Sequence, residues 1–397
     1  MSNPISTSNV SMGLLVAFAG FASSFAVVIQ GLKGVGASDA QAASGLVVLA
    51  LAMGACGVLL SLQSRIPVSV AWSTPGAALL ATTGLVEGGF PVAVGGFLVC
   101  AVAIIATGLF KPIAKAIDLI PMSLANAMLA GILLGLCLAP FKAIAFDPLL
   151  GLPLFLAWVL AGMWNRLLAV PAALMAFILV IVFGVDVPDD AMKTVSGAAF
   201  PDLVFVTPHF TLAGVVNVAL PLFIVTMASQ NIPGVAVLRT NDYPVHTRTW
   251  FTATGFFSLL ASPFGGHAVN LAAITAAMCA GEESHPDRGR RYMTAVIAGL
   301  GYCLFGLFAG AVTAFVSLAP SILIEAVAGL ALIGAFSMAA KAALEEETSR
   351  EAAAITFLVT ASGVNISGIS GAFWGLLAGV LVLAARNVAN RSNRSAS

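Results

Sequence analysis

Long apolar runs, separated by short charged or turn-forming stretches, fill most of the chain. In the first half these runs lie near residues 12–33, 38–63, 67–84, 90–110, 118–140, 147–164 and 167–185. In the second half they lie near residues 211–239, 246–261, 263–280, 290–316, 319–342, 349–367 and 370–388. Most of them have about the 20 residues that a helix needs to cross the hydrocarbon core of a bilayer. The pattern predicts an all-α polytopic membrane protein with fourteen transmembrane segments.

Basic residues test this count, because Lys and Arg concentrate in loops on the cytoplasmic side of a membrane. If the predicted segments alternate in direction, only Lys33, Lys142 and Lys193 of the 17 Lys and Arg residues fall on one side. All the others fall on the opposite side. This asymmetry supports the count and predicts that both termini are cytoplasmic.

Each half has seven segments, so the second half starts from the opposite side of the membrane to the first. Residues 12–185 and 211–388 are therefore expected to form inverted repeats. Inverted repeats are a common architecture of secondary transporters, whose substrate sites lie near the bilayer midplane at the interface between the repeats.

The third segment of each repeat departs from the pattern of a full transmembrane helix. In the first repeat, RIPVSVAWSTPGAALLATTG begins with alternating small and β-branched residues, and Ser73 or Thr74 can cap a helix that has Pro75 in its first turn. In the second repeat, ASPFGGHAVNLAAITAAMCAG places two glycines before its apolar run, and its helix is expected to begin near Gly265. Both segments are predicted to be a short strand followed by a half-length helix. Since the backbone of a strand cannot face lipid, the two strands are expected to pair with each other.

Two such helices would direct their N-termini at one another in the middle of the membrane. Each N-terminus carries about half a positive charge and free N–H groups, which together bind anions. The predicted ligand is a small anion, bound by residues near the two helix starts and near the Pro233 break in segment eight. These candidates are Trp72, Ser73, Thr74, Gln230, Asn231, Phe264, Gly265, Gly266, His267 and Asn270.

The candidates also have structural interpretations. The hydroxyl groups can act as caps alone, and the two amides of segment eight can satisfy backbone groups that Pro233 frees. Trp72 and Phe264 precede the two predicted caps, where their rings can either hold an aromatic ligand between them or pack in the interior. Asn270 can bind the ligand or hold the two segments together.

Two titratable residues are candidates for proton coupling. His267 lies within a predicted membrane segment, and the ordinary pKa of histidine is near the range in which a proton-coupled carrier works. Glu325 is the one acidic residue that the predicted boundaries place within a segment. An isolated buried carboxylate is costly unless it is protonated or paired, so Glu325 either takes part in coupling or lies near the outer end of its segment, facing water.

Composition narrows the class of protein further. The chain has 397 residues, of which 60% are hydrophobic and 9% charged, whereas soluble proteins carry roughly a quarter charged residues. The net charge is zero, which gives no reason to expect nucleic acid as a partner. The five cysteines lie in apolar runs without metal-type spacing, so we expect neither disulfides nor a metal or cofactor site. No catalytic motif of a membrane enzyme occurs, and the first ten residues lack the basic region of a signal peptide.

Two long motifs carry a resemblance to a known family. RIPVSVAWSTPGAALL, together with NVALPLFIVTMASQNIPGVAVLRTNDY (residues 217–243), resembles the benzoate/proton symporter family, BenE-type. The resemblance extends over essentially the whole chain. Within the wider superfamily, the chain is similar to nucleobase–cation and sulfate/bicarbonate transporters.

The resemblance implies two domains that move against each other. A core domain would combine segments 1–4 (12–110) and 8–11 (211–316), and a gate domain would combine segments 5–7 (118–185) and 12–14 (319–388). It also implies an elevator-like mechanism, protons as the coupled cation, a homodimer through the gate domain, and the inner membrane of a bacterium as the location.

At two positions the chain departs from its nucleobase-transporting relatives. Gln230 or Asn231 lies nearest the position of a substrate-binding glutamate, and His267 corresponds to a second glutamate. Loss of both acids favours a ligand that bears a carboxylate. The chain is therefore expected to import benzoate or a similar aromatic acid with protons. The alternatives are a carrier or exchanger of small inorganic anions and a nucleobase carrier.

Two charged stretches, EESHPDRGRRY and KAALEEETSRE, fall in predicted cytoplasmic loops. The positive-inside rule favours the interpretation that both are solvated linkers near lipid headgroups.

Overall fold

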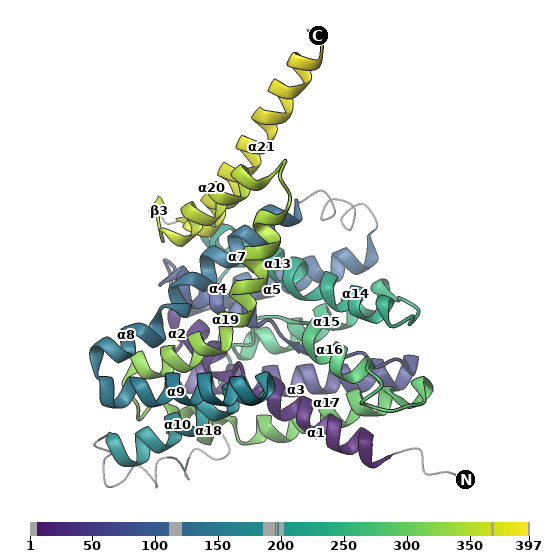
Figure 1. Cartoon of the computed structure of the whole chain (residues 1–397), viewed down its shortest axis with the longest axis vertical. Coiled ribbons are helices and arrows are strands. Elements are labelled where there is room, and N and C mark those ends of the chain that lie inside the picture. Colours follow the sequence, from purple (N-terminus) through teal and green to yellow (C-terminus); the bar gives the residue numbers. More distant parts are fainter. Residues whose placement is uncertain are drawn as a thin grey trace.

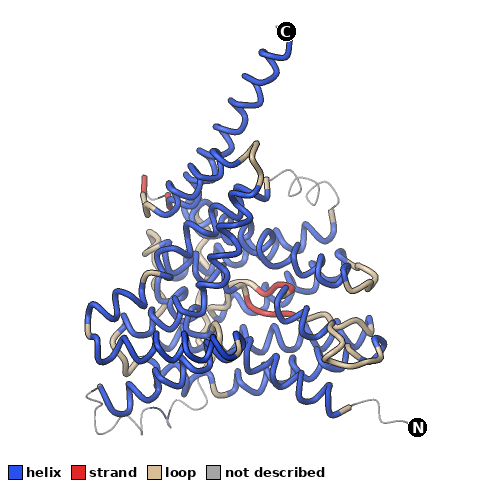
Figure 2. Tube along the Cα trace, in the orientation of Figure 1, coloured by secondary structure: helices blue, strands red, loops and turns tan. Residues whose placement is uncertain are grey.

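The computed structural model of this chain describes residues 6–110, 121–185, 195, 197, 202–366 and 369–395. These residues form a bundle of helices with two short antiparallel ribbons of two strands each (Figures 1 and 2). The last helix, α21, extends away from the bundle and carries the C-terminus with it (Figure 1). Lys111, Lys115 and Lys193, which contributed to the predicted orientation, lie outside the described residues.

The elements of the first half follow the predicted runs. They are α1 (Thr7–Ala22), α2 (Phe25–Gly34), α3 (Asp39–Ser64), β1 (Val70–Trp72), α4 (Thr74–Thr83), α5 (Phe90–Leu109), α7 (Met122–Cys137), α8 (Ala139–Phe146), α9 (Pro148–Trp164), η1 (Arg166–Leu168) and α10 (Ala169–Gly184). The first run is broken into α1 and α2 by a turn at Ser23 and Ser24.

The second half is more interrupted. Its elements are α12 (Leu212–Gly214), η2 (Val215–Ala219), α13 (Leu220–Thr226), η3 (Met227–Asn231), α14 (Ile232–Thr240), α15 (Thr247–Ala261), η4 (Ser262–Phe264), β2 (Val269–Leu271), α16 (Ala273–Ala280), η5 (Arg288–Arg290), α17 (Tyr292–Leu307), α18 (Ala309–Val316), α19 (Ser321–Glu345), α20 (Arg350–Ala361), β3 (Asn365–Ile366), β4 (Ile369–Ser370) and α21 (Gly371–Ser395).

Length and composition qualify six helical stretches of the described chain as membrane spans, or up to seven if the bent pair α17 and α18 counts as one span. Three shorter apolar helices are Pro148–Trp164, Ala169–Gly184 and Gly371–Arg386. Each of the predicted runs contains a helix. The protein is therefore a mostly helical membrane protein, and the count of fourteen segments stays a prediction.

Helix α3 illustrates how the bundle is held together. Ser38 caps it with a capping box to Gln41, and its 26 residues are rich in small side chains. A Cβ atom added to Gly54 would lie 2.4 Å from the carbonyl oxygen of Gly299 on α17, so only glycine allows this close approach of the two backbones. Elsewhere α5 packs on α15, and α19 packs on α7 and α8.

Candidate functional site

The two irregular segments meet in the interior of the bundle. β1 pairs antiparallel with β2 in the register Val70↔Leu271, Ala71↔Asn270 and Trp72↔Val269. This β1–β2 ribbon lies among the helices, as the short strands in Figure 2 show. Its strands are buried, so the backbone hydrogen bonds between them satisfy groups that could not be satisfied by lipid. The predicted pairing of the two strands is confirmed.

A short helix leaves each end of this ribbon. The ten residues of α4 follow β1, and the eight residues of α16 follow β2. Because the strands are antiparallel, the N-termini of the two helices lie at opposite ends of the ribbon. Hydrogen bonds from Ser73 N to Ala268 O (2.9 Å) and from Ala272 N to Ser69 O (3.0 Å) continue the ladder to the start of each helix.

The predicted start of the second helix was wrong. It begins at Ala273, not near Gly265. Gly265 has φ +91° and ends the turn η4, a conformation that favours glycine. A Cβ on Gly266 would lie 2.7 Å from that of Ala261, so both glycines serve the approach to β2 rather than a helix N-terminus. The difference arises because Val269–Leu271, which the prediction included in the helix, form strand β2.

Ser73 is the N-cap of α4. Its Oγ accepts a hydrogen bond from Gly76 N (3.1 Å) and lies 2.8 Å from Thr226 Oγ1. Both hydroxyl groups belong to fully buried residues. Thr74 is the first residue of the helix and is partly exposed, and Pro75 occupies the first turn as predicted. Of the two possible caps, the structure selects Ser73.

The segment opposite this cap contains two π-helical stretches, η2 and η3. Such insertions are rare and are frequent at functional sites. Thr226 immediately precedes η3 and contacts the cap, a role that the sequence analysis missed. The only signal for it was a hydroxyl residue one helical turn before the predicted amides.

The two predicted amides of η3 do different things. Asn231 is fully buried, and its Oδ1 accepts a hydrogen bond from Leu271 N (2.9 Å) on β2. Its Nδ2 lies 3.1 Å from the sulfur of Met227. Gln230 is partly exposed, and within the described chain its side chain makes no recorded hydrogen bond. Asn231 therefore anchors the ribbon, while Gln230 keeps its amide available.

Asn270 occupies the centre of the ribbon, opposite Ala71. In the amide orientation that satisfies both of its ends, Oδ1 accepts from Ser73 N (3.0 Å) and Nδ2 donates to Leu271 O (2.8 Å). It thus joins β2 to the cap of α4, which agrees with the structural interpretation of this residue.

His267 is fully buried directly before β2. Its Nδ1 accepts a hydrogen bond from Ala268 N (2.7 Å), and its ring meets the edge of Phe97 on α5 at 6.3 Å between centroids. An acceptor at Nδ1 places the proton of the neutral ring on Nε2. Among the described residues Nε2 has no hydrogen-bond partner.

The two predicted ring-binding residues have separate surroundings. Trp72 is buried, donates from Nε1 to Ser24 Oγ (2.8 Å) and lies 5.3 Å from the ring of Phe21. Phe264 packs instead on Phe205, at 5.8 Å between ring centroids. The structure gives these rings different aromatic neighbours, and it does not support a ligand held between them.

Glu325 is the fifth of the 25 residues of α19 and is partly exposed. At 1.5 Å per residue it lies only about 6 Å along the helix from its start. No ion pair involving it is found in the described part of the chain. This position agrees better with the alternative of a carboxylate near the end of its segment.

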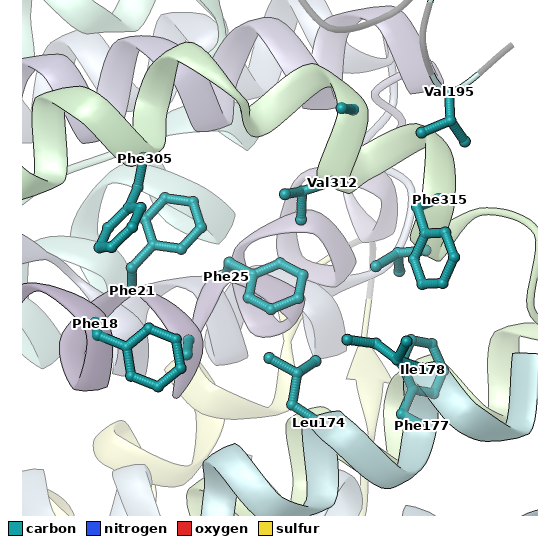
Figure 3. Close-up of a pocket in the computed structure, with 13 residues that line it drawn as sticks. Phe18, Phe21, Phe25, Leu174, Phe177, Ile178, Val195, Phe305, Val312 and Phe315 are labelled. Carbon is teal, nitrogen blue, oxygen red and sulfur yellow. The ribbon is translucent and has the colours of Figure 1, made fainter. Parts of the chain in front are cut away.

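A wholly apolar cavity of about 370 Å³ has Phe21, the aromatic neighbour of Trp72, in its wall (Figure 3). Figure 3 shows Phe18, Phe21 and Phe305 at one end, Phe177 and Phe315 at the other, and Phe25 between them. The wall is completed by Ala22, Leu174, Ile178, Val195, Ala311, Val312 and Val316. Its volume is at the lower end of the roughly 300–1,000 Å³ found for small-molecule sites, which suits a small ring.

A family model described as benzoate membrane transport protein, BenE, matches residues 3–385 of the chain. The chain belongs to this family. The resemblance found in the sequence is thereby confirmed, and the protein is a membrane transport protein rather than an enzyme.

Individual relatives agree with this family. The chain is 40% identical over 384 residues to inner membrane protein YdcO of Escherichia coli, with 96% of each chain covered. It is 34% identical over 342 residues to the benzoate membrane transport protein of Acinetobacter baylyi, with 84% of each covered. Among solved structures, the transmembrane domain of the cyanobacterial bicarbonate transporter BicA matches with a TM-score of 0.57 and 14% identity, covering 96% of this chain and 97% of that one. At this identity the last match shows a shared fold alone.

Proposed function

We propose that this protein is a secondary active transporter that imports benzoate or a similar aromatic carboxylate together with protons. The observation that carries the proposal is the buried β1–β2 ribbon with a half-length helix leaving each end, in a chain of the benzoate transport family. The Acinetobacter relative is named as a benzoate transport protein, and we extend that substrate class to this chain.

The proposed architecture has fourteen segments in two inverted repeats, residues 12–185 and 211–388, with cytoplasmic termini in a bacterial inner membrane. The core domain would contain α1–α5 and α12–α18, and the gate domain α7–α10 and α19–α21. The extensive packing of α3 on α17 and of α5 on α15, and separately of α19 and α20 on α7, supports this division. An elevator-like movement of core against gate, and a homodimer through the gate, complete the proposal.

The carboxylate is proposed to bind at the first turns of α4 and α16. Within the described chain Arg291 is the only Lys, Arg, Asp or Glu residue that is buried, and it lies at the other end of α16. An anion at the ribbon would therefore depend on backbone N–H groups and the positive ends of the two helices rather than on a cationic side chain. Ser73 and Asn231 would hold those backbone groups in place.

The ring of the substrate is proposed to bind in the apolar cavity that Phe21 lines. Phe21 lines the cavity and contacts Trp72, the residue directly before the cap of α4. The cavity is bounded by α1, α2, α17 and α18 from the proposed core and by α10 from the proposed gate. A ring bound there would lie between the two parts that move.

Proton coupling is required by the charge of the substrate. Import of one anion against a negative-inside potential costs about 2.3 kcal/mol per 100 mV, so accumulation needs a coupled cation. We propose His267 as the coupling residue, ahead of Glu325. A second proton on His267 would go to Nδ1, which could then no longer accept the hydrogen bond from Ala268 N. Because Ala268 O accepts a hydrogen bond from Ser73 N, this change would reach the cap of α4.

Uptake of labelled benzoate into proteoliposomes tests the function. We expect accumulation under an imposed inward proton gradient and its loss when the gradient is collapsed. Exchange that ignores the gradient and follows counter-anions would instead favour a carrier of small anions. Competition by uracil but not by benzoate would favour a nucleobase carrier.

A further inference from the structure

The charged stretch EESHPDRGRRY, residues 282–292, contains two buried polar side chains among mostly exposed residues. Ser284 is fully buried and Arg291 is 7% exposed. Ser284 Oγ lies 2.9 Å from Thr294 Oγ1, and Thr294 Oγ1 accepts a hydrogen bond from Asn9 Nδ2 (3.0 Å) on α1. Tyr243 donates from its hydroxyl to Arg288 O (3.1 Å). The stretch therefore joins the ends of α1, α14, α16 and α17.

Arg291 joins this stretch to the C-terminus of α16. It donates from Nη1 to Ala280 O (2.7 Å), at the last residue of α16, and from Nε to His285 O (2.8 Å). No carboxylate lies within ion-pair distance of it in the described chain. Its charge is instead opposed by carbonyl groups at the negative end of the α16 dipole, where a cation is stabilising.

The two half-length helices are fixed at different ends. α4 has a side-chain cap at its N-terminus, Ser73, and no basic residue in its last turn. α16 has Ala272 at its N-cap, which offers no side-chain acceptor, and its C-terminus is held by Arg291. With eight residues α16 is about 12 Å long, and its last residue, Ala280, is buried. Arg291 donates to the carbonyl oxygen of Ala280 in the last turn of α16, while the first turn of α16 has no side-chain cap.

We infer that Arg291 is a positioning residue for substrate binding: it fixes α16 from the end remote from the ribbon, so that the uncapped first turn of α16 keeps its N–H groups for the anion. This inference rests on the function proposed above, because it assigns a role to the anion-binding end of α16. A separate contact holds the same stretch against the end of α14, since the guanidinium of Arg288 lies 4.4 Å from the centre of the Tyr243 ring.

The test compares Arg291→Ala and Arg291→Lys with the wild type, with Arg248→Ala as a matched control. Arg248 is exposed near the start of α15 and has no recorded side-chain contact in the described chain. Hydrogen–deuterium exchange of the α16 amides measures positioning directly. We expect several-fold faster exchange in Arg291→Ala, a smaller increase in Arg291→Lys, which keeps the charge but not the two-pronged geometry, and no change in Arg248→Ala.

Benzoate uptake measures the consequence for the site. We expect KM to rise about tenfold in Arg291→Ala with a smaller change in maximal rate, partial recovery in Arg291→Lys, and a wild-type KM in Arg248→Ala. If Arg291→Ala does not fold, Arg291→Lys and Ser284→Ala supply the comparison.

The two measurements separate the inference from the proposed function. Unchanged α16 exchange and unchanged KM in a folded Arg291 variant would overturn the inference. Faster α16 exchange with unchanged KM would overturn the role in substrate binding. If the wild-type protein moves no benzoate, the proposed function fails, and the positioning role then fails as well unless the same KM shift appears with the anion that is transported.

Discussion

Removal of the Ser73 hydroxyl group gives a direct test of the site, because its contacts are few and known. Ser73→Ala removes the cap on Gly76 N and, among the described residues, the only side-chain partner of Thr226 Oγ1. Loss of an N-cap costs about 1 kcal/mol, and a buried hydroxyl without a partner costs about 1–3 kcal/mol. Thr226 can turn to a carbonyl one turn back in its own helix, which favours the lower end of that range. We expect a total loss of about 2 kcal/mol of folding free energy.

The expected effect on transport follows from the same free-energy change. If the whole loss fell on substrate binding, about 2 kcal/mol would raise KM roughly 30-fold. Part of it will appear instead as lower stability, so we expect a rise of between about 3-fold and 30-fold. Initial rates of benzoate uptake measure KM, and the thermal unfolding midpoint in detergent measures stability. Thr74→Ala is the matched control, because Thr74 is the neighbouring helix residue and does not cap.

A double-mutant cycle with Thr226→Val isolates the bond between the two hydroxyl groups. Once Thr226 has no hydroxyl group, Ser73→Ala should cost only the cap, about 1 kcal/mol. The reasoning is refuted if Ser73→Ala and Thr74→Ala behave alike, or if the cost of Ser73→Ala is the same with and without Thr226→Val.

Three other substitutions test the rest of the site. His267→Ala should abolish proton-driven accumulation while sparing benzoate counterflow, and accumulation at the wild-type level would remove His267 from coupling. Ala311→Leu should fill part of the apolar cavity and raise the KM for benzoate. In competition assays it should raise the inhibition constants of ring-substituted benzoates by a larger factor. Equal inhibition constants for the wild type and Ala311→Leu would exclude ring binding in this cavity. Asn231→Asp keeps an acceptor for Leu271 N but buries a carboxylate, so it should lower thermal stability and raise the KM for benzoate. Gln230→Glu, at a partly exposed position, is its comparison, and a wild-type KM in a folded Asn231→Asp variant would contradict anion binding at the ribbon.

The strands and short helices of the site were predictable because their sequences leave few alternatives. Ser73 followed by Pro75 specifies a helix start, and the preceding β-branched residues favour an extended chain. A backbone in that conformation needs a partner in the membrane interior, and only the matching segment offers one. The pairing of β1 with β2 therefore follows from the sequences of the two segments.

The start of α16 was not predictable by the same signals. Gly265 and Gly266 resemble the glycines of an anion-binding turn, but here they allow η4 to end and the chain to approach α3 and α15. The helix itself begins after Ala272, which has no capping side chain and so leaves no mark in the sequence. The contact of Thr226 was missed for a related reason, since it joins residues that are 153 positions apart in the chain. The contacts of Arg291 are local, but nothing in the pattern of charges distinguishes Arg291 from the exposed arginine Arg288 nearby.

The amide of Asn231 has a structural role as well as a proposed effect on which ligand is bound. Asn231 uses its oxygen on the backbone of β2, so this amide has a structural role whatever the substrate is. A carboxylate at that place would make the same contact, but it would add a negative charge beside the proposed anion site. Two like charges in a site that is shielded from water repel each other, and every increment of about 1.4 kcal/mol in repulsion lowers affinity roughly tenfold. The neutral amide therefore matters for the charge that it lacks, and this is why the absence of an acid favours a carboxylate ligand over a nucleobase.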